Sequence, residues 1–159
     1  MTKLEKATFG AGCFWHVEEA FGKLKGVKET AAGFMGGWKK NPSYLLVSTS
    51  ITGHAEVVQI TYNPREIAYQ KLLEVFWSIH DPTTKNRQGP DIGPQYRSVI
   101  FFHTREQEKL AMESRKKQEE SGKYGKPIVT EIKPASEFWK AEEYHQKYLQ
   151  KKGPGKCPV

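Results

Sequence analysis

The apolar positions of this chain follow a helical period in some segments and a strand period in others. Between Cys13 and Gly26 they recur every three or four residues, which predicts a helix that begins beside the cysteine. Between Ala55 and Tyr62 apolar and polar residues alternate, which predicts a strand with Glu56 on its apolar face. The same criteria predict further strands at 7–9, 27–34, 97–102 and 127–133, and further helices at 64–79, 104–122 and from 136 onward. Helices that alternate with such strands indicate an α+β domain of two layers.

Glycine, proline and capping residues set the expected element boundaries. Pro64 is expected to open the second helix, and Thr104 with Gln107 forms a capping-box pattern at the start of the third. Ser136 is expected to cap a last helix that carries His145 on its buried face. Residues 83–96 hold several turn signals and few aliphatic side chains, which predicts a long loop of the kind that is often functional.

Length and composition bound what the chain can form. Its 159 residues are 37% hydrophobic, enough for one domain with a core that needs neither disulfides nor a metal. We therefore expect residues 1–159 to form a single domain, with a mobile tail from about residue 152. The sequence contains no stretch long enough to span a membrane and no apolar signal region, so a cytoplasmic location is expected.

The net charge of +7 leaves a second class of function open. Basic residues attract nucleic acid, so a basic RNA-binding module without catalytic activity is the alternative to an enzyme. The basic residues are interleaved with acids, however, as in 113–120, and no recognised RNA-binding motif is present. These features favour a solvated surface and no specific nucleic-acid partner.

Cys13 lies between a glycine-rich segment, 10–12, and the aromatic pair Phe14 and Trp15. A thiol at a helix start faces unpaired backbone N–H groups and the positive end of the helix dipole, which favour the thiolate. Glycines beside it would leave room for a substrate to approach. A buried and inert cysteine remains the other interpretation.

Other groups could support such a thiol. Glu56 would keep its proton near neutral pH if it lies on the buried face of its strand, although it could equally lie just outside the sheet. Tyr44, Tyr96 and Asp91 lie in or beside the predicted loops, where the phenols could donate hydrogen bonds to a polarised oxygen. Cys157, the second cysteine, could reach an oxidised Cys13 and form a disulfide with it.

Metal and nucleotide sites find little support in the residue pattern. Cys13 and His16 have a suitable spacing for a metal, but no second ligand pair accompanies them. No glycine-rich nucleotide motif is present, so we expect neither a metal nor a bound cofactor.

Five motifs in a fixed order resemble one known family. The chain is similar to the peptide methionine sulfoxide reductase A family in G-C-F-W (12–15), G-F-M-G-G (33–37), T-G-H-A-E (52–56), the long H-D-P-T-T-K-N-R-Q-G-P-D-I-G-P-Q-Y-R-S (80–98) and Y-H-Q-K-Y-L (144–149). The resemblance implies a two-layer α+β sandwich with a mixed sheet and a ferredoxin-like core. It also implies reduction of the S epimer of methionine sulfoxide, free or in proteins, by a monomer that uses thioredoxin or a similar dithiol.

The resemblance further assigns roles to residues of this chain. It makes Cys13 the nucleophile and Cys157 the resolving cysteine. Glu56 would be the acid that protonates the sulfoxide oxygen, and Tyr44 and Tyr96 would donate hydrogen bonds to that oxygen. Phe14 and Trp15 would form the pocket for the methyl group, and Asp91 would shape the site. The chain departs from the family pattern at two positions. It has His16 where the family usually has glycine, and Phe34 where the family has tyrosine.

Overall fold

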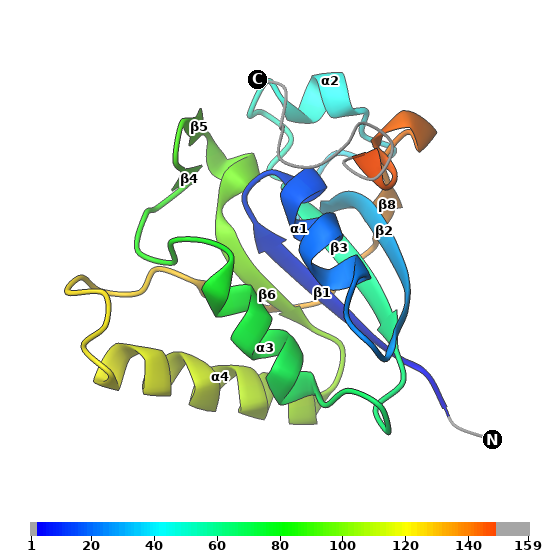
Figure 1. Ribbon diagram of the computed structural model, residues 1–159. Coiled ribbons are helices and arrows are strands. Elements are labelled where there is room, and N and C mark those ends of the chain that lie inside the picture. The colour runs from blue at the N-terminus through cyan, green and yellow to red at the C-terminus, as the bar shows by residue number, and fades with distance from the viewer. Residues whose placement is uncertain (1–2, 149–159) are drawn as a thin grey trace.

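A mixed six-stranded sheet forms the centre of the molecule (Figure 1). The computed structural model describes residues 3–148, so the predicted tail from residue 152 lies outside the described part of the chain. The strands follow the order β7-β6-β1-β3-β2-β8. Their bounds are β1 Glu5–Ala11, β2 Val27–Met35, β3 Ala55–Tyr62, β6 Ser98–Phe102, β7 Glu131–Pro134 and β8 Trp139–Lys140.

Four of these strands and two helices form the ferredoxin-like core. The helices are α1 (Phe14–Gly22), which connects β1 to β2, and α3 (Tyr69–Ser78), which precedes β6. Neighbouring strands in the order β6-β1-β3-β2 are all antiparallel. The β-α-β-β-α-β sequence with this strand order is the expected topology. β7 then adds to β6 in parallel, which makes the sheet mixed.

The helices α1 and α3 lie on the same side of the sheet (Figure 1). Between these helices and the sheet, Phe9 stacks on Phe21 of α1 and on Phe76 of α3, with ring centroids 5.2 Å apart in each pair. Val58 and Ile60 of β3 belong to the same cluster of buried side chains. Alternation along β3 therefore directs Glu56 toward this helix-covered face.

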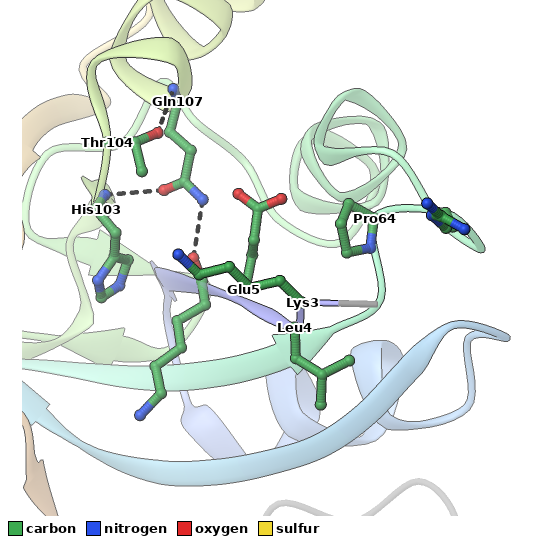
Figure 2. Close-up of a pocket in the computed structure, with 9 residues that line it drawn as sticks. Lys3, Leu4, Glu5, Pro64, His103, Thr104 and Gln107 are labelled. Atoms are coloured by element: carbon green, nitrogen blue, oxygen red, sulfur yellow. Dashed lines mark hydrogen bonds between the residues drawn. The ribbon is translucent and has the colours of Figure 1, made fainter. Parts of the chain in front are cut away.

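The helix α4 (Arg105–Glu120) is capped as its sequence predicts, with one difference. The Thr104 hydroxyl accepts a hydrogen bond from the Gln107 N–H over 3.1 Å (Figure 2). The Gln107 side-chain oxygen accepts the N–H of His103, and not the N–H of the cap residue Thr104. The side-chain amide of Gln107 also donates to the Lys6 carbonyl over 2.8 Å. One glutamine thus ties the start of α4 to β1.

A hollow of about 410 Å³ lies beside this glutamine (Figure 2). It opens at the first residues of β1, whereas Cys13 lies beyond the other end of that strand, two residues after Ala11. None of the predicted site residues lines it.

Two predicted helices differ from the structure. The segment from Pro64 is a turn, because the Asn63 side chain and carbonyl accept the N–H groups of Arg65 and Glu66, so α3 begins only at Tyr69. No long helix follows Ser136 within the described residues. The chain there forms β8, which pairs with the open edge of β2, and then a 3₁₀ turn, Glu143–His145.

Two other segments contain structure that the sequence pattern did not indicate. The predicted loop 83–96 holds a small hairpin of β4 (Arg87–Gln88) and β5 (Asp91–Ile92), followed by the 3₁₀ turn Pro94–Tyr96. A one-turn helix, α2 (Tyr44–Val47), follows the glycine-rich loop and is capped by the Ser43 hydroxyl.

Candidate active site

Cys13 lies at the junction between the end of β1 and the start of α1. It is the N-cap residue of α1, with φ −57° and ψ 121°, and its carbonyl accepts the N–H of Val17 over 3.4 Å. The side chain is partly buried against the core. The predicted position at the first turn of a helix is therefore confirmed, and with it the partial positive charge that favours an anion there.

The glycines before Cys13 pack against the protein itself. A Cβ on Gly10 would come within 2.8 Å of Val99 Cγ1, and one on Gly12 within 2.9 Å of the Gln88 side chain. Gly12 also has φ +94°, which side-chain-bearing residues rarely adopt. The space beside these glycines is thus filled by the protein, because Gly10 lets Val99 of β6 pack against β1 and Gly12 lets the Gln88 side chain pack against the residue before Cys13.

Glu56 lies beside Cys13 in space, 43 positions later in the sequence. It is 1% exposed, and its Oε1 accepts the backbone N–H of Phe14, the residue after the cysteine, over 3.3 Å. Its other oxygen, Oε2, is buried and has no hydrogen-bond partner among residues 3–148. This settles the question left open by the sequence, since Glu56 lies within the sheet and not outside it.

Burial determines the protonation of Glu56. Removal from water raises the pKa of this carboxyl from 4.5 to about 8, the Phe14 N–H opposes the rise, and the negative charge of Asp91 adds to it. Glu56 therefore keeps its proton at neutral pH. A neutral acid in a dry site can donate that proton.

Two tyrosines lie close to this carboxyl. Burial and then the Glu56 charge raise the pKa of Tyr96 to about 12, and the same two causes raise the pKa of Tyr44. Asp91, on β5, adds to both shifts, which places all four groups within electrostatic reach of one another. Both phenols therefore keep their protons and can act as donors.

Aromatic rings form one wall of the site. Phe14 is fully buried and Trp15 is 6% exposed, and their ring centroids lie 6.0 Å and 6.2 Å from that of Tyr44. Phe34 lies fully buried behind Phe14, with 5.7 Å between the ring centroids. An apolar surface of this kind suits a small methyl group.

His145 is a residue of the site that the sequence pattern misplaced. It was expected on the buried face of a long helix, but it lies in the 3₁₀ turn 143–145, with its ring centroid 4.2 Å from Tyr44 and 5.3 Å from Phe14. The Y-H-Q-K-Y-L motif was the signal that could have indicated it.

The remaining predictions concern Cys157, His16 and metal ligands. Cys157 lies outside the described residues. His16 is exposed. Within residues 3–148, no group of three His, Cys, Asp or Glu side chains is arranged to hold a metal ion. No helix in this same range is long and apolar enough to cross a membrane.

Sequence comparison decides the family. The profile described as peptide methionine sulfoxide reductase matches residues 5–159. The chain belongs to the peptide methionine sulfoxide reductase family. A relative from Geobacter metallireducens, a peptide methionine sulfoxide reductase MsrA, is 62% identical over 155 residues, which cover 98% of this chain and 96% of the relative.

Solved structures agree with this family assignment. Mxr1 from Saccharomyces cerevisiae in reduced form matches with a TM-score of 0.89 at 38% identity, over 98% of this chain and 89% of that protein. Mxr1 in complex with Trx2 matches with a TM-score of 0.64 at 27% identity, over 99% of this chain and 88% of that one. The two-layer α+β fold is thus common to this chain and its relatives.

Proposed function

We propose that this chain reduces the S epimer of methionine sulfoxide, free or in proteins, to methionine. Membership of the reductase family makes methionine sulfoxide the substrate. The observation that supports a mechanism is the buried carboxyl of Glu56, which accepts the backbone N–H of Phe14, the residue after Cys13. An attacking thiolate and a neutral acid are both needed in one pocket, because a sulfoxide oxygen leaves poorly until it is protonated.

In the proposed first step, the Cys13 thiolate attacks the sulfoxide sulfur while Glu56 gives its proton to the oxygen. Tyr44 and Tyr96 donate hydrogen bonds to that oxygen, and Phe14 and Trp15 hold the methyl group. The oxygen then passes from the methionine sulfur to the Cys13 sulfur: the S–O bond of the sulfoxide and the bond between the two sulfurs break, methionine leaves, and Cys13 becomes a sulfenic acid. The sulfoxide is thereby reduced by two electrons and the thiol oxidised by two.

Two further steps restore the thiol. Cys157 attacks the sulfur of the Cys13 sulfenic acid, which forms a disulfide and releases water. Thioredoxin or a similar dithiol then reduces the disulfide by exchange. The structure of a yeast relative, Mxr1, in complex with Trx2 supports thioredoxin as the reductant.

Asp91 is proposed to shape the electrostatics of the site. Its negative charge raises the pKa of Glu56 and of both tyrosines, which favours the protonated donor form of each. No cofactor takes part in this scheme, and the cytoplasmic location and monomeric state stay predictions from the sequence.

The family match extends over residues 5–159 and gives no support to the RNA-binding alternative.

The direct test of the proposed nucleophile is Cys13→Ser. We expect this variant to lose all reduction of methionine sulfoxide with either dithiothreitol or thioredoxin, while its fold is retained. Reduction at the wild-type rate would reject Cys13 as the nucleophile.

A further inference from the structure

Trp15 and His145 are joined by a hydrogen bond that the proposed mechanism does not use. The indole Nε1–H of Trp15 donates to Nδ1 of His145 over 3.0 Å. Both side chains are buried, at 6% and 1% exposure, and their rings stack with centroids 5.5 Å apart at an angle of 22°. The two residues are 130 positions apart in the sequence, so the bond depends on the tertiary fold.

This bond determines the tautomer of the imidazole. An indole nitrogen can only donate, so Nδ1 must offer a lone pair, and the imidazole proton lies on Nε2. Burial lowers the pKa of His145, which keeps the ring neutral and the acceptor available. The Nε2 atom is buried without a hydrogen-bond partner in the described part of the chain.

The chain around His145 is fixed to the sheet and to α1. The Gln146 side chain accepts the Ala32 N–H of β2 over 2.8 Å and donates to the Ala32 and Ala141 carbonyls over 2.9 Å. The Lys147 N–H donates to the buried carboxylate of Glu18 on α1 over 2.6 Å. The imidazole therefore projects from a backbone with little freedom to move.

The orientation of the indole matters because its ring forms part of the aromatic wall. One face of the indole stacks on Tyr148, with centroids 4.1 Å apart, which sets the plane of the ring. A half-turn about the Cβ–Cγ bond would keep that plane, so the N–H bond to His145 selects one of the two orientations. A held N–H defines which edge of the ring faces the neighbouring cysteine. The position of the substrate's methyl group would follow from that edge.

We propose that His145 is a positioning residue, whose Nδ1 lone pair fixes the orientation of the Trp15 indole and, through it, the place of the substrate's methyl group beside Cys13. The inference rests on the proposed role of Trp15 in binding that methyl group. His145 itself takes no part in bond making in this scheme.

Three variants test the acceptor. His145→Asn keeps an acceptor at the position of Nδ1, because Oδ1 is the same number of bonds from Cα. His145→Gln moves its acceptor one bond further out, and His145→Phe keeps the ring without an acceptor. We expect near-wild-type activity for Asn, and for Gln and Phe a roughly 5- to 100-fold lower kcat/KM with methionine sulfoxide, the range for loss of a buried hydrogen bond.

The first readout is independent of activity. The indole N–H resonance of Trp15, assigned by its disappearance in Trp15→Phe, should move upfield in His145→Phe and His145→Gln and stay near its place in His145→Asn. A resonance that does not move in His145→Phe overturns the inference, whatever happens to the activity. His103→Phe, a change of the histidine that bonds Thr8 near the start of α4, is the matched control and should leave both readouts unchanged.

The second readout is a double-mutant cycle. Trp15→Phe and His145→Phe should be strongly non-additive in kcat/KM, because the histidine acts only through the indole. Additive losses, or equal damage from Asn and Phe, would overturn the positioning role. An unchanged kcat/KM in Trp15→Phe would reject the methyl-pocket role of Trp15, and with it the positioning role of His145. An indole N–H resonance that does not move in His145→Phe would reject the positioning role of His145 alone.

Discussion

The backbone N–H of Phe14 donates to Oε1 of Glu56 over 3.3 Å, and this bond joins the first turn of α1 to β3. Phe14 directly follows Cys13, so the bond holds a carboxyl group next to the cysteine. It also occupies one of the unpaired N–H groups of the helix start. The other carboxyl oxygen then has no partner among the described residues and is available for a proton and a substrate oxygen.

The acid role of Glu56 predicts a specific pH dependence. In the wild type the pKa of about 8 means that sulfoxide reduction slows as pH rises through 8, since only the protonated form donates. Glu56→Gln cannot donate a proton, so we expect single-turnover reduction to be roughly 10²- to 10⁴-fold slower below pH 8. Stopped-flow measurement of methionine release between pH 6 and pH 10, roughly two units on either side of the pKa of Glu56, tests this, and the step near pH 8 should vanish in the variant.

A surface glutamate provides the control for this experiment. Glu66 forms an ion pair with Lys28 over 2.6 Å at the far end of β2, and this partner lowers the pKa of Glu66. Glu66→Gln should keep the wild-type profile. If Glu56→Gln also kept the step near pH 8, the acid role of Glu56 would be wrong.

The same carboxyl predicts a cost in stability. Its pKa is raised on folding from 4.5 to about 8, so the unfolded chain releases this proton first and the free energy of unfolding falls as pH rises between those values. Glu56→Gln removes the cost, which is absent near pH 4 and on the order of 4 kcal/mol at pH 8. Urea unfolding at both pH values should show equal stability at the lower one and a more stable variant at the higher one. A variant less stable than the wild type at pH 8 would contradict the buried acid.

The two phenols are expected to act together on the sulfoxide oxygen. Tyr96→Phe and Tyr44→Phe each remove one donor and leave the ring in place, so each should lower kcat by roughly 10- to 10³-fold, as losses of single donors do elsewhere. KM should change less than kcat, because the bonds strengthen as the oxygen becomes basic. Tyr62→Phe, whose hydroxyl lies against Gln107 at the other end of β3, is the matched control. Steady-state kinetics that show no loss in either site variant would remove the tyrosines from the mechanism.

Gly12 is predicted to be required for the position of Cys13. Gly12→Ala places a Cβ at φ +94° and within 2.9 Å of Gln88, which should cost roughly 1–3 kcal/mol and lower activity. Gly122→Ala offers a comparison, since its φ is +69° but no atom lies within 4 Å of the added Cβ. Gly122→Ala should lose stability only by the cost of the backbone conformation, and it should keep full activity. Equal effects of the two substitutions would show that packing around Gly12 is unimportant.

Cys157 is predicted to matter for turnover and not for the first round. Cys157→Ser should release about one methionine per chain and then stop with thioredoxin, because the sulfenic acid on Cys13 has no thiol to form the disulfide. Rapid-quench counting of methionine against enzyme measures this. Sustained thioredoxin-dependent turnover in the variant would reject Cys157 as the essential resolving cysteine.

Local pattern predicted much of the fold and the centre of the site. Alternation from 55 to 62 placed Glu56 on the apolar face, and the helical period after residue 13 placed Cys13 at a helix start, because both depend on residues close in sequence. The capping residues of α4 were predicted for the same reason.

Long-range contacts account for what the pattern missed. The segment after Ser136 has helical spacing, but the open edge of β2 and the buried pairing of His145 with Trp15 stabilise an extended chain and a short turn instead. The glycines before Cys13 looked like access for a substrate because the sequence does not show that Val99 and Gln88 occupy the space. The pKa of Glu56 likewise depends on burial by residues from several elements, which no local period reports.

The most direct test of the proposed reaction is a single-turnover assay on reduced wild-type protein without added reductant, with each epimer of a methionine sulfoxide peptide. We expect that only the S epimer is consumed, that one methionine forms per chain, and that two thiols per chain are lost in the same reaction. Equal consumption of the R epimer, or methionine formation without loss of thiols, would contradict it.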